Sequence, residues 1–133
     1  MSCDLTQQDV NTATGRDVPV NPATATEASG CNWANRSTGS FVEVDLNQDP
    51  ASIQLPTAAP AFPGIGRYTQ YYDATQNPSL VGQCFQHTCQ FTASVITASN
   101  ENAMVSVYLN PPAANPKSVA QSLLQAIVRN TAK

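Results

Sequence analysis

The sequence contains four cysteines and one histidine, the residue types best suited to metal, redox or nucleophilic chemistry. Cys84 and Cys89 are separated by four residues, and His87 lies between them. A zinc site needs a fourth ligand and usually a second ligand pair, and Cys3 and Cys31 stand too isolated in the sequence to supply one. The C-x-x-C spacing of redox sites is absent, and no nearby basic residue lowers a thiol pKa. We therefore expect no metal and no cofactor, and the even cysteine count favours disulfides in an oxidising compartment.

Nucleophilic catalysis has little support in the sequence. His87 is the only histidine, so any Ser-His-Asp or Cys-His site would depend on it. No G-x-S-x-G elbow marks a serine as a nucleophile. We therefore expect His87 to be a surface residue in a turn.

Two of the nine acidic residues form the best candidate pair for acid–base work. Glu43 and Asp45 lie two residues apart in an expected strand, so they share a face at a separation of about 6–7 Å. Glycosidases use carboxylate pairs in this range. With Asp49 the pair could also hold calcium weakly, although no Asp-x-Asp-x-Asp loop is present. Residues on the exposed face of a hairpin usually contact only water, so we expect solvated carboxylates and keep a carboxylate-dependent hydrolase as an alternative.

A group of aromatic residues is the strongest lead to a binding site. They lie in or beside irregular, proline-rich segments, and they are Phe62, Tyr68, Tyr71, Tyr72 and Phe85. Loops carry binding residues more often than core elements do, and tyrosine suits contacts with sugars, peptides or lipid headgroups. We therefore predict a candidate ligand groove here. The alternative is that these rings close a second small core.

The stretch that positions the acidic pair reads as a hairpin. Cys31–Ala34 is followed by a polar break that contains Ser37-Thr38-Gly39, and then by Phe41–Leu46. Apolar and acidic residues alternate through the second half, which is the period of a strand with one wet face. Trp33 is the only tryptophan and shares a face with Cys31, so we expect it to anchor the core.

The N-terminal segment carries the signals of a short helix. Thr6 can cap the free amides, and Asp9 can complete a capping box three residues later. Gly15 is placed to end the helix in a left-handed conformation. The region from Gly15 to Gly30 then reads as a connecting loop with a possible short strand at 18–20.

The middle of the chain is rich in proline. Residues 48–66 contain four prolines, which exclude a long helix and disfavour a central strand. Ile53 and Leu55 could form a brief edge strand. Gly64-Ile65-Gly66 is not a dinucleotide fingerprint, because the third glycine and a preceding strong strand are missing.

The last third predicts a second hairpin and a helix. Residues 91–98 and 103–109 have strand patterns, with a turn at 99–102 between them. Asn115 caps the final helix, and Pro116 occupies its first turn. Its apolar stripe consists of Val119, Leu123, Leu124, Ile127 and Val128. The fold class is therefore α+β: an antiparallel β-sheet with the N-terminal and C-terminal helices packed on one face.

Length and charge limit the number of domains and the kinds of binding partner that the protein can have. A chain of 133 residues predicts a single domain over residues 1–133. Charged residues make up 11% and the net charge is −3, without a basic cluster, which argues against nucleic acid and against charge-driven membrane binding. No run is long enough to span a bilayer. Since no signal peptide is present, we expect a mature exported fragment, and we expect a monomer.

Several short motifs resemble a known family. In order they are Cys3-Asp4-Leu5-Thr6, Asp9-Val10, Thr14-Gly15, Gly30-Cys31-Asn32-Trp33, the strand at 41–46, Gly64-Ile65-Gly66 and the helix at 120–128. This pattern resembles the actinobacterial envelope lipoproteins of the DUF3558 family, and the likeness covers most of the chain. The resemblance implies a Cys3–Cys31 disulfide, which leaves Cys84 to pair with Cys89. It also implies export and a lipid anchor upstream of residue 1, with no established activity.

The expected function follows from this setting. We expect a non-enzymatic, exported cell-envelope domain of the lipoprotein type that binds a small molecule, a lipid or glycan, or an envelope protein. Its only link to the membrane would be the lipid anchor. The first alternative is an extracellular sensor or inhibitor module, since mycobacterial receptor-kinase sensor domains look distantly similar. The second alternative is the carboxylate-dependent hydrolase.

Overall fold

The computed structural model describes residues 4–19, 30–47, 57–84 and 86–131, without the side chains of Gly30, Cys31 and Asn47. The elements are α1 (Gln7–Thr14), β1 (Gly30–Ala34), β2 (Phe41–Asn47), β3 (Tyr68–Asp73), β4 (Gln83–Cys84), β5 (His87–Thr88), β6 (Phe91–Ile96), β7 (Asn102–Tyr108) and α2 (Pro116–Thr131). No helix among these residues is long and apolar enough to cross a membrane.

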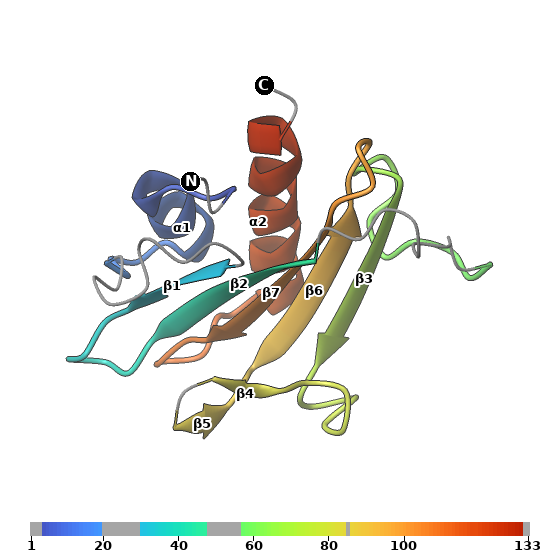
Figure 1. Cartoon of the computed structure of the whole chain (residues 1–133). Helices are drawn as coiled ribbons and strands as arrows, with labels where there is room; N and C mark the ends of the chain where they lie inside the picture. The colour runs from blue at the N-terminus through green and yellow to red at the C-terminus, as the bar shows by residue number, and fades with distance from the viewer. Residues whose placement is uncertain (1–3, 20–29, 48–56, 85, 132–133) are drawn as a thin grey trace.

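Five strands form one antiparallel sheet in the order β1-β2-β7-β6-β3. Both helices lie on the same side of this sheet (Figure 1). The prediction of an α+β domain with an antiparallel sheet and two helices on one face is therefore confirmed. The two predicted hairpins are β1–β2 and β6–β7, and they meet through the β2–β7 pairing at the centre.

The core lies between the helices and the sheet. Register places Val42 opposite Val107, and Val107 opposite Phe91, so one row of large side chains crosses three strands. All three side chains are fully buried. The core side of α2 contributes Leu123, Leu124 and Ile127, which are also fully buried, as the predicted stripe required. Burying one such side chain stabilises the fold by about 1.5–3 kcal/mol, so this layer holds α2 on the sheet.

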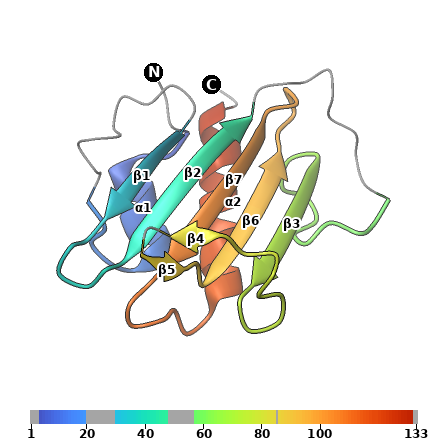
Figure 2. The ribbon, with the colours of Figure 1, turned by 60° about the horizontal axis from the view of Figure 1, so that its bottom comes forward.

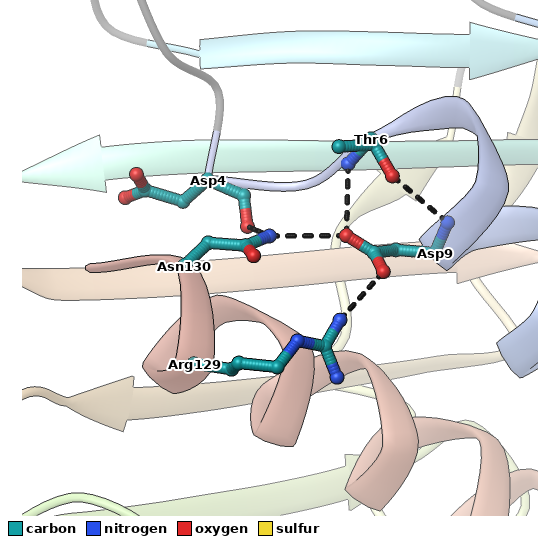
Figure 3. A network of polar contacts seen from close by, with 5 residues as sticks. All are labelled: Asp4, Thr6, Asp9, Arg129 and Asn130. Atoms are coloured by element: carbon teal, nitrogen blue, oxygen red, sulfur yellow. Dashed lines mark hydrogen bonds and ion pairs between the residues drawn. The ribbon is translucent and has the colours of Figure 1, made fainter. Parts of the chain in front are cut away.

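Helix α1 begins and ends as its sequence predicts. The Thr6 hydroxyl accepts a hydrogen bond from the Asp9 backbone amide, and the Asp9 carboxylate accepts one from the Thr6 amide. Gly15 ends the helix at φ 69°, in the left-handed region. The Asp9 carboxylate also accepts hydrogen bonds from Arg129 and Asn130 in the last turns of α2 (Figure 3). This network joins the start of α1 to the end of α2.

Strand β3 is the main difference from the sequence expectation, which predicted no strand here and placed the tyrosines in or beside irregular, proline-rich segments. Tyr68–Asp73 pairs with β6 along its whole length and forms one edge of the sheet. Thr69 and Tyr71 point to the core side, while Tyr68 and Tyr72 point to the other side. Aromatic residues thus occur on both faces, which hides the usual alternation of apolar and polar positions.

Other differences concern short segments. Val18 and Pro19 are not in a strand, although the Pro19 carbonyl accepts a hydrogen bond from the Ala34 amide at the edge of β1. The rest of that predicted strand, the predicted edge strand at Ile53 and Leu55, and Asp49 lie outside the described residues. The small β4–β5 hairpin was not predicted.

Candidate functional site

The sheet face opposite the helices is the candidate site, and we call it the open face. Strand alternation turns toward it Asn32, Ala34, Phe41, Glu43, Asp45, Tyr68, Gln70, Tyr72, Thr92, Ser94, Ile96, Asn102, Met104, Ser106 and Tyr108. Figure 2 views the molecule from this side, with both helices behind the sheet and the β4–β5 hairpin in front of it.

The β4–β5 hairpin covers one end of the open face. A disulfide joins Cys84 to Cys89, and both residues are fully buried against Phe41 of the sheet. The ring of His87 stacks on the ring of Tyr108, with centroids 4.3 Å apart and planes 6° apart. The predicted Cys84–Cys89 bond is confirmed. His87 is exposed, in β5 rather than in a turn.

The row of residues next to the hairpin crosses four strands. Glu43 lies opposite Ser106, Ser106 opposite Thr92, and Thr92 opposite Tyr72. Ser106 and Thr92 are each only 5% exposed. Among the described residues, no hydrogen bond joins either hydroxyl to another group. Neither hydroxyl oxygen is among the described buried polar atoms that lack a partner, so both oxygens keep some contact with solvent.

The following row is more open to solvent. Asp45 lies opposite Met104, and Met104 lies opposite Ser94. Met104 is 40% exposed, one of two large hydrophobic residues with such exposure in the described part of the chain. The Ser94 hydroxyl donates to the Gln70 side-chain oxygen at 3.3 Å. A hydrophobic side chain thus stands beside the second carboxylate.

The open face carries negative charge. Burial raises the pKa of Glu43, and the neighbouring charge of Asp45 raises it further. Burial also raises the pKa of Asp45. None of the basic residues that the structure describes occupies an open-face strand position. The two carboxylates therefore sit partly desolvated on the same side of one strand, and no described basic residue occupies a neighbouring strand position on this face.

The structure does not bring the predicted aromatic group together on one surface. Phe62 and Tyr71 belong to the main core, with ring centroids 6.2 Å apart. Tyr68 is buried at the open face, and Tyr72 packs beside the residues under the β4–β5 hairpin. Phe85 lies outside the described residues. Burial and the neighbouring Asp73 raise the pKa of Tyr71 to about 12, in keeping with its packing against the main core.

The remaining candidates concern metal binding and the second disulfide. No group of three or more metal-ligating side chains occurs among the described residues. Cys3 and the side chain of Cys31 lie outside them, so the predicted Cys3–Cys31 bond is not described, and a single disulfide is seen where two were expected. The backbone of Cys31 pairs with Val44 in the β1–β2 hairpin, as predicted.

Sequence reasoning found Glu43 and Asp45 but missed their neighbours. Ser106, Thr92 and Met104 belong to strands that were predicted, so their face could be assigned from alternation. Their position beside the carboxylates depends on the β2–β7 pairing, which no local pattern reveals.

Comparisons with known proteins add no assignment: no protein-family model and no curated protein matches the sequence, and no solved structure matches the fold.

Proposed function

We propose that this protein is a non-enzymatic, exported cell-envelope domain that binds a ligand or a partner protein through its open face. The observation that carries the proposal is the difference between the two faces of the sheet. Helices close one face, while the other face, which the hairpin covers in part, presents two partly desolvated carboxylates, two hydroxyl residues that are each 5% exposed, and an exposed methionine. Large side chains and charges left at an uncovered sheet surface favour a binding role.

The disulfide supports the exported setting. Disulfides persist in oxidising compartments and are rare in the cytosol. The Cys84–Cys89 bond closes the β4–β5 hairpin, and both cysteines are fully buried against Phe41 of the sheet. The resemblance to DUF3558 lipoproteins adds a Cys3–Cys31 bond and a lipid anchor upstream of residue 1 to the proposal.

Binding is favoured over hydrolysis by the placement of the acids. Glycosidases place their two carboxylates on opposite sides of the bond that they cleave. Glu43 and Asp45 point the same way from a single strand. The hydrolase therefore ranks below a binding domain. A sensor or inhibitor module shares the same binding face, and it differs in what precedes the domain: a transmembrane helix rather than a lipobox cysteine.

Amide chemical shifts recorded during titrations test the proposed face. The three probes are N-acetylchitotriose for glycans, dodecylphosphocholine micelles for lipid headgroups, and a hexalysine peptide for protein partners. We expect at least one probe to shift amides of β2, β6 and β7 while leaving the exposed side of α2 unchanged. Shifts confined to the helices, or none with any probe, would contradict the proposal.

Mass spectrometry tests the exported state. Denatured, unreduced protein treated with an alkylating reagent is expected to gain no alkyl group, because the proposal pairs all four cysteines. Two alkylated cysteines would contradict the proposed Cys3–Cys31 bond, and with it the family resemblance.

A further inference from the structure

The row of Glu43, Ser106 and Thr92 offers several hydrogen-bond acceptors at one place. Cross-strand neighbours have Cβ atoms about 4.5–5.5 Å apart, so the carboxylate and the two hydroxyls are consecutive groups along one line. Both residues are 5% exposed, and neither hydroxyl makes a hydrogen bond to the described residues. Neither oxygen is among the described buried atoms that lack a partner, so both keep some access to solvent. Such groups gain from a ligand that brings N–H donors to them. An ammonium or guanidinium group supplies several donors at once.

The charge on the open face favours the same kind of ligand. Asp45 follows Glu43 on the same side of β2, and no described basic side chain occupies an open-face position. Burial and mutual repulsion raise the pKa of Glu43. A cation placed between the two acids would relieve that repulsion. Anionic ligands such as phosphates would be repelled by the same pair.

The surroundings fit a long side chain better than a metal ion. Calcium needs six to eight oxygen ligands, and the described residues hold no cluster of three or more metal-ligating groups. Met104 stands opposite Asp45 and is 40% exposed, which provides an apolar surface beside the acids. Lysine and arginine bury their methylene stems on such surfaces while the charged head reaches a carboxylate.

We propose that Glu43, Asp45, Ser106 and Thr92 form a subsite for a lysine or arginine side chain of a partner protein, with Met104 contacting its methylene stem. The proposal rests on the proposed function, because it assigns a ligand chemistry to the same open face. The acids supply charge, the hydroxyls supply acceptors beside the hairpin, and the methionine selects a long aliphatic stem. The partner is therefore a protein segment with an exposed basic residue.

Binding of labelled hexalysine, followed by fluorescence anisotropy, tests this subsite. The matched probe is the same peptide with its side-chain amines acetylated, which keeps the stem and removes the charge. We expect only the cationic peptide to bind, and we expect its affinity to fall between about 10 mM and about 150 mM salt, where the Debye length shortens from about 30 Å to about 8 Å. Equal binding of both peptides would overturn the proposal.

Variants separate a built subsite from general attraction to an acidic protein. Glu43→Gln and Asp45→Asn should each weaken hexalysine binding by about fivefold. Asp17→Asn removes the same charge from an exposed position beside α1, away from the open face, and should leave binding unchanged. Ser106→Ala should weaken binding about threefold without altering the salt dependence. Equal losses for Asp17→Asn and Glu43→Gln would overturn the subsite.

Two further results keep the test decisive. The thermal unfolding of each variant is compared with that of the unsubstituted protein. If Ser106→Ala does not fold, the loss of hexalysine binding is measured on Asp45→Asn, whose substitution lies at an exposed position. If chitotriose shifts the open-face amides and hexalysine does not, the cationic subsite is wrong while the proposed function stands. If no probe shifts these amides, both are wrong.

Discussion

The Asp9 carboxylate accepts a hydrogen bond from the Arg129 guanidinium at 2.6 Å, and the two residues lie 120 positions apart. The same carboxylate accepts hydrogen bonds from the Thr6 amide at 3.1 Å and from the Asn130 side chain at 3.0 Å. An acid at the start of α1 and a base at the end of α2 also suit the two helix dipoles. One side chain thus caps a helix and joins both ends of the described chain.

Replacing this carboxylate should destabilise the fold. Asp9→Ala removes half of the capping box and the contacts with Asn130 and Arg129, so we expect the free energy of unfolding to fall by about 1–2 kcal/mol at pH 7. Most of this comes from the cap and from Asn130, because Arg129 is 59% exposed and its ion pair is screened by solvent. Urea denaturation measures the change. Asp17→Ala, at an exposed position, should cost less than about 0.5 kcal/mol.

The contribution of Asp9 should depend on pH. Burial raises its pKa, but hydrogen bonds from Asn130 and Thr6, together with the charge of Arg129, outweigh burial and lower the pKa below its usual value. A carboxyl with a lowered folded-state pKa contributes stability above its unfolded pKa of about 3.9, and loses it as the pH falls through the folded value. The stability difference between the natural sequence and Asp9→Ala should therefore shrink below about pH 4. A difference that persists unchanged at about pH 2 would contradict this account.

Replacing Glu43 should change the free energy of unfolding in the opposite direction from replacing Asp9. Burial and the charge of Asp45 raise its pKa, so the charged form costs stability at pH 7 and the cost disappears below the unfolded pKa of about 4.3. After solvent screening, Glu43→Gln should raise the free energy of unfolding by about 0.3 kcal/mol at neutral pH, and the gain should vanish in acid. Asp73→Asn is the contrasting variant. The pKa of Asp73 is lowered, chiefly by a hydrogen bond from Thr75, so its replacement should destabilise the protein at pH 7.

Gly66 and Gly64 form a matched pair in the turn before β3. A Cβ on Gly66 would lie 2.6 Å from the Ile96 carbonyl oxygen and 2.7 Å from a methyl group of Val95, whereas a Cβ on Gly64 would meet nothing within 4 Å. Both residues have positive φ, so backbone strain is common to the two substitutions. Gly66→Ala should therefore lower the free energy of unfolding by about 1–3 kcal/mol more than Gly64→Ala. Thermal unfolding of the two variants decides this, and equal losses would mean that the contact with β6 relaxes freely.

The disulfide should stabilise the β4–β5 hairpin more than the rest of the fold. Its loop is short, with a sequence separation of 5, so replacing Cys84 and Cys89 by serine should cost about 2 kcal/mol by the loop-entropy estimate. We also expect amide exchange at His87 and Thr88 to rise, while β6 and β7 stay protected. Gln83→Ala, an exposed change in the same hairpin, is the control. Equal loss of protection throughout the sheet would show that the hairpin is part of the global folding unit.

Elements with local signals could be predicted from the sequence. The capping residues Thr6 and Asn115 marked the starts of α1 and α2, and both side chains accept hydrogen bonds from backbone amides of the first turn. Strand alternation marked β2 and β7 in the same way. Strand β3 lacked such a signal, because Tyr68 and Tyr72 face one side while Tyr71 faces the other. Its strand conformation depends on pairing with β6 rather than on its own pattern.

The candidate site was also predicted only in part, where a local sequence pattern was sufficient. The shared face of Glu43 and Asp45 followed from their spacing alone, and the structure confirms it. The contribution of Ser106 and Thr92 could not be predicted, because it requires the register between strands that are far apart in the sequence. The aromatic grouping was inferred from closeness in sequence. The two-residue period of β3 instead separates its tyrosines, so closeness along the chain was a poor guide to a shared surface.

The two ends of the described chain lie together on the helical side of the sheet, where the Asn130 side chain donates to the Asp4 carbonyl at 3.0 Å (Figures 1 and 3). Immobilising the protein on a sensor chip, or displaying it on a carrier particle, could therefore use either terminus with the same orientation. In both cases the acidic sheet surface would point toward the analyte.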